Sequence, residues 1–179
     1  MKLNLKTDKI MKKFIKDLND FKESDYFSYE SKCDLWGDKN ISLIIDFGEE
    51  ANKSEMLTKY EDKINEILKW INSNKKSVCN FLISHQCITL AEEWVSENNE
   101  EIKENSYKDE YGKIINIPIT DEDFYKAMYL DSVLIDFEED ESKPDTTMHI
   151  LFKPDYFKHR SLIVYVDGDK NIEYGDIAG

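Results

Sequence analysis

The first half of the chain carries apolar residues at the spacing of helices. An amphipathic helix is predicted over 8–22, where apolar positions lie three or four residues apart and Lys and Asp fill most of the others. Two longer helices are predicted over 54–72 and 76–97, each with a continuous apolar stripe. Because only three residues separate them, we expect these two helices to pack as antiparallel neighbours. A short helix is also expected over 120–128, which begins with a cap residue and carboxylates.

Other parts of the chain have the patterns of strands and loops. The runs 26–30 and 40–47 are expected to be strands, separated by a turn at 36–39. Four further strands are expected in the last third of the chain: 132–138, 147–152, 161–166 and 171–177. Asp167-Gly168 is typical of a hairpin turn between the last two of these. Residues 97–116 are strongly polar and have no period, which predicts a loop or a frayed helix end followed by a loop.

These elements predict one α+β domain over 1–179, since no Gly/Ser-rich linker or internal repeat interrupts the chain. The expected architecture is an antiparallel sheet of five to seven strands with three to four helices packed mainly on one face. In chain order, we expect an amphipathic helix, strands, a helical part and antiparallel strands over 1–24, 25–50, 52–128 and 129–179.

The charge of the chain is large and unevenly distributed. The 24 Lys and Arg and 38 Asp and Glu give a net charge of −14. Residues 92–145 hold 5 basic and 18 acidic side chains, a net charge of −13, whereas residues 1–91 hold 15 of each. Such a field repels nucleic acid and anionic membranes and attracts a basic protein. Ten carboxylates are therefore candidates for binding a basic partner: Glu97, Glu100, Glu101, Asp109, Glu110, Asp136, Glu138, Glu139, Asp140 and Glu141.

The expected compartment is the cytoplasm, in a soluble form without membrane contact. No run of 18 apolar residues is present, and the basic N-terminus lacks the apolar core of a signal peptide. Cys33, Cys79 and Cys87 are odd in number and do not form a compact framework, as expected for reduced thiols.

The sequence contains no known catalytic motif, and we expect no catalytic residues, no metal and no cofactor. Cys79, His85 and Cys87 are separated by six and two residues along a predicted helix. Side chains at these spacings point in different directions around the helix, which disfavours a shared metal site. The alternation Asp167-x-Asp169-x-Asn171 begins like a calcium loop but lacks the Gly and the final carboxylate that such a loop needs. An alternative left open is a small-molecule-binding or enzymatic site that uses His159 and Arg160, the single Arg of the chain.

The C-terminal part of the chain resembles a widespread group of small bacterial domains of unknown function. The resemblance rests on Phe152-Lys153-Pro154-Asp155-Tyr156-Phe157, on His159 and Ser161, on the Asp167-Gly168 hairpin and on the closing Ile177-Ala178-Gly179. The turn at Trp36-Gly37-Asp38 is also similar, and the resemblance covers about residues 35–179. Where the group has Gly-His-Ser, this chain has His159-Arg160-Ser161 preceded by Lys158.

Proteins of this group are often thought to be immunity proteins, which neutralise toxins exchanged between bacteria. The resemblance therefore implies a non-catalytic protein that binds a basic toxin domain through an acidic surface. A third hypothesis, mimicry of nucleic acid, requires the carboxylates to lie on one face of the molecule with the spacing of phosphates.

Overall fold

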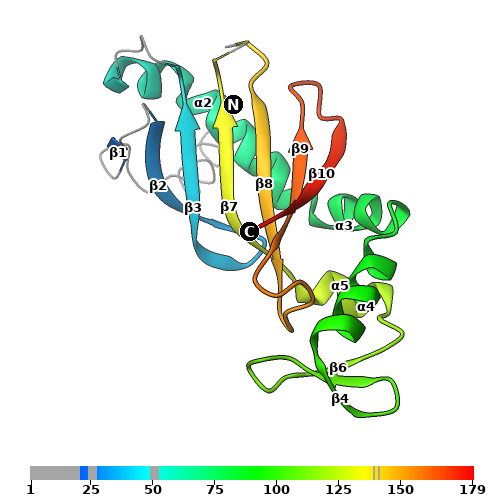
Figure 1. Ribbon diagram of the computed structural model, residues 1–179. Coiled ribbons are helices and arrows are strands. Elements are labelled where there is room, and N and C mark those ends of the chain that lie inside the picture. Colours follow the sequence, from blue (N-terminus) through cyan, green and yellow to red (C-terminus); the bar gives the residue numbers. More distant parts are fainter. Residues whose placement is uncertain (1–20, 24–27, 49–52, 139, 141) are drawn as a thin grey trace, which may run out of the picture.

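The computed structural model describes residues 21–23, 28–48, 53–138, 140 and 142–179. The helix expected over 8–22 lies outside these residues, apart from Phe21 and Lys22, and Lys22 belongs to a strand. The predicted class, α+β, is confirmed, with a seven-stranded main sheet, a separate three-stranded sheet and four helices in the described part of the chain (Figure 1).

The main sheet has the strand order β1-β2-β3-β7-β8-β9-β10. Its strands are β1 (Lys22–Glu23), β2 (Ser28–Leu35), β3 (Asp38–Asp46), β7 (Met128–Asp136), β8 (Asp145–Phe152), β9 (Ser161–Val166) and β10 (Ile172–Ala178). The expected strands of the last third are therefore confirmed, and Asp167-Gly168 lies in the hairpin between β9 and β10.

The sheet is mixed, so the prediction of a purely antiparallel sheet was wrong. β3 and β7 are parallel neighbours, with Leu43 opposite Val133, and the other pairs of this sheet are antiparallel. The long, mainly helical segment between β3 and β7 forms a crossover connection. It places β7 beside β3, with both strands running in the same direction. The alternation of apolar residues specifies which face of a strand is buried but carries no information on its direction.

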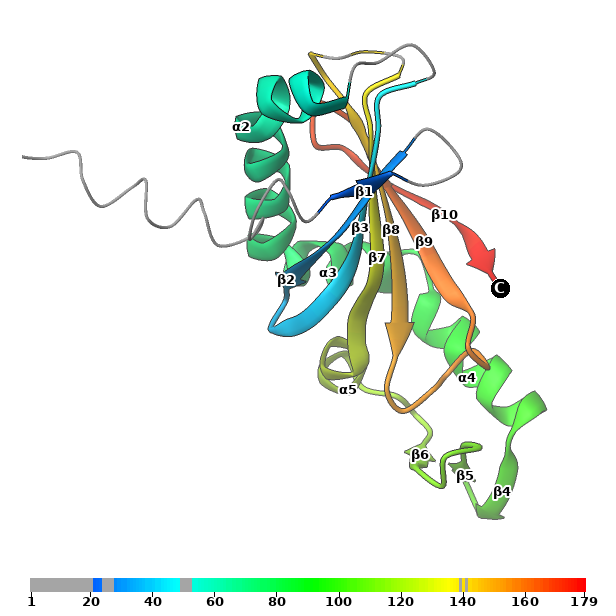
Figure 2. The same cartoon turned by 90° about the vertical axis from the view of Figure 1, so that its left-hand side faces the viewer.

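The helices are α2 (Lys53–Ser73), α3 (Lys75–Ser84), α4 (Cys87–Asn98) and α5 (Asp121–Ala127). The single helix expected over 76–97 is thus two helices, because Gln86 adopts a left-handed conformation with φ of 61°. Asn74 alone joins α2 to α3, and α3 turns away instead of folding back as an antiparallel neighbour (Figure 1). α2 and α3 lie beside one face of the main sheet (Figure 2), where α2 contacts β2 and α3 contacts β10.

The core fills the space between this face and the helices. The cross-strand row Leu43, Val133, Met148 and Val164 is fully buried, as are Ile64, Leu68 and Ile71 of α2. Cys33, Cys79 and Cys87 are buried and free of disulfides. Among the described residues, no helix is both long enough and apolar enough to cross a membrane.

Residues 97–116 were expected to be a loop, or a frayed helix end followed by a loop. The helix α4 ends at Asn98, and residues 100–116 form a small three-stranded sheet of β4 (Glu100–Lys103), β5 (Ser106–Lys108) and β6 (Ile114–Asn116). The prediction failed because all of β4 is exposed, as are both ends of β6, so the strands lack the apolar alternation of half-buried strands. The small sheet, by which we mean residues 100–116, projects beyond one end of the main sheet (Figures 1 and 2).

Candidate functional site

Eight of the ten carboxylates expected to bind a partner belong to the described residues, and they lie in two places. Glu97 lies in the last turn of α4. Four more of these carboxylates belong to the small sheet: Glu100, Glu101, Asp109 and Glu110. Asp136 ends β7, with Glu138 and Asp140 in the turn that follows, at the opposite end of the main sheet (Figure 1). Glu139 and Glu141 lie outside the described residues. The carboxylates therefore do not share one surface, which is an arrangement unlike the continuous face that nucleic-acid mimicry requires.

Asp136 and Asp140 stabilise the turn that follows β7 through hydrogen bonds to its backbone. Asp136 Oδ1 accepts a hydrogen bond of 2.8 Å from the backbone N–H of Glu138. Asp140 Oδ1 accepts hydrogen bonds from the hydroxyl and the backbone N–H of Ser142, at 2.6 and 2.8 Å. These hydrogen bonds hold the pKa of Asp140 below its ordinary value. Asp136 and Asp140 therefore have a local structural role in this turn.

The small sheet combines exposed carboxylates with exposed apolar side chains. Four large hydrophobic residues are exposed in the described chain, and three of them belong to this sheet: Ile102 (46% exposed), Tyr111 (66%) and Ile114 (47%). Glu100, Glu101, Glu104 and Glu110 are exposed in the same segment, as are Lys103, Lys108 and Lys113. An exposed apolar group rimmed by charged residues is a feature of protein–protein interfaces.

Asp109 differs from its acidic neighbours because it is buried, with 4% of its surface exposed. Its Oδ1 accepts hydrogen bonds from the backbone N–H groups of Tyr111 (3.0 Å) and Lys113 (2.6 Å), which closes the loop between β5 and β6. Its Oδ2 accepts a hydrogen bond of 3.3 Å from the backbone N–H of Asp155. Asp109 therefore supports the fold of the loop and does not present its carboxylate to a partner.

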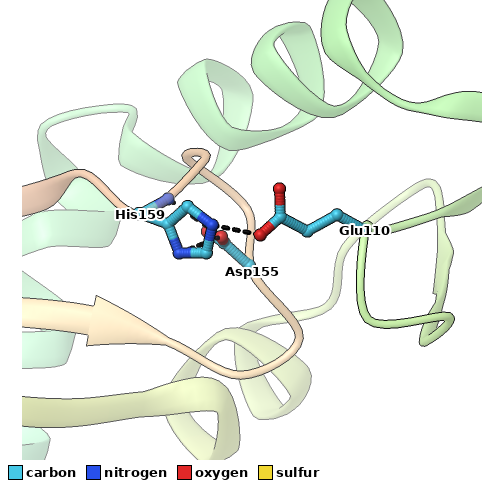
Figure 3. A group of neighbouring side chains, drawn as sticks. All are labelled: Glu110, Asp155 and His159. Carbon is cyan, nitrogen blue, oxygen red and sulfur yellow. Dashed lines mark hydrogen bonds and ion pairs between the residues drawn. The ribbon is translucent and has the colours of Figure 1, made fainter.

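Glu110, Asp155 and His159 form a cluster where the small sheet meets the loop between β8 and β9 (Figure 3). The Nε2 atom of His159 is paired with Oε1 of Glu110. Its Nδ1 lies 3.4 Å from Oδ2 of Asp155. One ligand atom from each of the three residues lies within 4.8 Å of the other two. The hydroxyl of Tyr111 completes the group, 3.2 Å from Nδ1 of His159.

The backbone of the β8–β9 loop fixes two members of this cluster. Asp155 Oδ1 accepts a hydrogen bond from the N–H of Phe157 (3.1 Å), and Oδ2 accepts one from the N–H of His159 (2.8 Å). Lys158 and His159 both have left-handed backbone conformations, with φ of 54° and 65°. The loop thus turns sharply and directs the imidazole back toward Asp155 and across to Glu110 (Figure 3).

A cavity of about 380 Å³ lies beside the cluster. It is lined by Asp109, Tyr111, Lys113, Tyr129, Leu151, Phe152, Lys153, Asp155 and His159. Burial and then the negative charge of Asp155 raise the pKa of Tyr129. Lysine ammonium groups, tyrosine hydroxyls, an imidazole and two carboxylates therefore line the cavity.

A second cavity, of about 610 Å³, adjoins the first, and both are bordered by Tyr129 and Lys153. Lys75 and Lys126 also line it, together with Trp36 and Asp38. Burial lowers the pKa of Lys75, although the nearby charge of Asp38 opposes this effect. Four lysines therefore line two adjoining cavities in a chain whose net charge is −14.

Arg160 does not join His159 at the cavity. Its Cζ atom lies 5.2 Å from the centre of the Trp94 ring, which is a cation–π arrangement.

The sequence identifies His159 as a candidate site residue but offers no reason to pair it with Glu110, 49 residues away, or with Asp155. These contacts depend on how the small sheet packs against the β8–β9 loop. Such packing cannot be predicted from the spacing of residues along the chain.

Residues 15–177 match the model of a family described as an uncharacterized protein conserved in bacteria (DUF2262). No curated protein and no solved structure matches the chain.

Proposed function

We propose that this chain, which belongs to the DUF2262 family of uncharacterized proteins conserved in bacteria, is a non-catalytic binding protein whose small sheet recognises a basic protein. The observation that carries the proposal is that one projecting element exposes the apolar side chains of Ile102, Tyr111 and Ile114 as well as several carboxylates. Apolar side chains supply affinity when a partner removes them from water, and the surrounding charges accelerate encounter and select the partner.

The partner we propose is a toxin domain, which makes the chain an immunity protein. This step rests on the resemblance of the C-terminal segment and on the charge of −13 carried by residues 92–145. A cationic nuclease-like domain is complementary to such a charge. We propose that this binding takes place in the cytoplasm, where the three buried thiols would stay reduced.

The test begins with a pull-down from the native cell, followed by binding measurements with the recovered basic protein. Ile114→Ala should weaken binding by about 5- to 30-fold, because it truncates a proposed apolar anchor. Tyr165→Ala is the control, since Tyr165 is 44% exposed but belongs to β9. Equal affinities for both variants and the unchanged chain would contradict the proposed surface.

The contribution of charge is tested by a second matched pair. Glu100→Gln, on the small sheet, should slow association and reduce its salt dependence. Glu138→Gln removes the same charge at the other end of the main sheet and should leave the association rate close to that of the unchanged chain. Association that is insensitive to salt in all three proteins would argue against a charge-selected partner.

The second candidate function is the binding of a small anionic molecule in the two adjoining cavities. It is favoured by Lys75, Lys113, Lys126 and Lys153, which line them, and by His159 at the edge of the first. Lys153 borders both cavities, so Lys153→Met should abolish such binding while Lys158→Met, in the same loop, should preserve it. A screen of phosphorylated and carboxylated metabolites by thermal shift tests this candidate, and the absence of any Lys153-dependent shift would remove it.

A further inference from the structure

The cluster of Glu110, Asp155 and His159 has the composition of a metal site. It offers one imidazole nitrogen and two carboxylate oxygens, and these atoms lie within 4.8 Å of one another. The residues come from two segments, the β5–β6 loop and the β8–β9 loop. We propose that these three side chains bind a divalent transition-metal ion, with Zn²⁺ as the best fit. This inference does not rest on the proposed recognition of a basic protein, although Glu110 belongs to both the cluster and the small sheet.

Two carboxylates lie beside one imidazole in this cluster. Oε1 of Glu110 is paired with Nε2 of His159, and Oδ2 of Asp155 lies 3.4 Å from Nδ1. The hydroxyl of Tyr111, 3.2 Å from Nδ1, brings no positive charge to these carboxylates. A divalent cation that takes an imidazole nitrogen and carboxylate oxygens as ligands would neutralise both carboxylates.

The structure already holds two of the proposed ligands in place. The carboxylate of Asp155 is fixed by two backbone N–H groups, and His159 is directed by its left-handed backbone. The buried Asp109 binds backbone groups of both loops, so it keeps Glu110 beside the β8–β9 loop. Metal binding would therefore require little ordering of the chain, which is the main entropic cost of forming a site.

The ligand set decides which metals fit. Zn²⁺ accepts both imidazole nitrogen and carboxylate oxygen, and sites with three protein ligands keep a position for water or another ligand. Mg²⁺ prefers oxygen ligands and holds its water tightly, so it should compete poorly for a site centred on an imidazole. The remaining ligand position is available to water or to an anionic group in the neighbouring cavity, which Lys113 and Lys153 line.

The experiment is calorimetric titration of the full chain, first treated with a chelator, with Zn²⁺ and Mg²⁺ in separate titrations. We expect one Zn²⁺ ion per chain and at least about tenfold weaker binding of Mg²⁺. Glu110→Gln is the sharpest variant, because Glu110 is exposed and contributes little to folding. It and His159→Ala should each weaken Zn²⁺ binding by at least about tenfold. His85→Ala is the control, since His85 is exposed at the junction of α3 and α4, and it should bind Zn²⁺ like the unchanged chain.

A second readout separates metal binding from a fold defect. The imidazole resonances of His159 should shift on addition of Zn²⁺, whereas those of His85 and His149 should not. The proposal is overturned if the unchanged chain binds no Zn²⁺, or if Glu110→Gln and His85→Ala affect binding equally. Partner binding that persists in chelator would leave the proposed function intact in either case.

Discussion

Asp109 accepts a hydrogen bond from the backbone N–H of Asp155, across 3.3 Å, and so joins the small sheet to the β8–β9 loop. The same carboxylate closes the β5–β6 loop through Tyr111 and Lys113. A single buried side chain thus supports both the proposed partner surface and the proposed metal site. This arrangement makes Asp109 the most informative position for mutation.

Asp109→Ala should destabilise the protein by about 2–4 kcal/mol, because three backbone N–H groups lose their acceptor. The measurement is the free energy of unfolding in urea. Glu100→Ala, at an exposed position of the same sheet, should change this free energy by less than about 0.5 kcal/mol. A similar small effect of both substitutions would show that Asp109 does not hold the two loops together.

The break between α3 and α4 can be tested at Gln86, whose φ is 61°. A glycine adopts this conformation without the steric cost that a side chain pays. Gln86→Gly should therefore stabilise the protein by up to about 1 kcal/mol, and Gln86→Val should destabilise it. Thermal unfolding measures both. A continuous helix through this position would give the opposite result, with glycine as the destabilising residue.

The N-terminus of α5 depends on Thr120, whose Oγ1 accepts a hydrogen bond of 3.1 Å from the N–H of Asp123. Thr120→Ala should cost about 1 kcal/mol of folding free energy, and Thr120→Ser should restore most of it. Chemical denaturation of the three proteins provides the comparison. Equal stability of the Ala and Ser variants would mean that the hydroxyl does not cap the helix.

The buried thiol of Cys87 should make the free energy of unfolding depend on pH. Burial raises the pKa of Cys87 to about 11, so its thiol stays protonated in the folded protein when it would ionise in the unfolded chain. Its contribution to stability is therefore complete below about pH 8.5 and declines as the pH rises toward 11. Cys87→Ala should remove part of this decline. Measurements of unfolding between pH 7 and 10 test the sign, and stability that increases over this range because of Cys87 would contradict it.

Much of the main sheet could be predicted from the sequence, and its connectivity could not. The strand Ser161–Val166 and its hairpin were predicted because alternation and turn residues are local signals. The parallel pairing of Leu43 with Val133 depends on a long crossover, and the helix break at Gln86 interrupts no apolar period. The contact between His159 and Glu110 also joins distant segments. Local patterns thus located the elements, whereas tertiary packing created the candidate site.

Hydrogen exchange of the chain with and without its recovered basic partner tests the central claim most directly. The small sheet is the proposed contact, so backbone amides within 100–116 should exchange more slowly in the complex, while those of 136–145 should be unchanged. Protection of 136–145 without protection of 100–116 would contradict the account, since it would assign the partner to the opposite end of the main sheet.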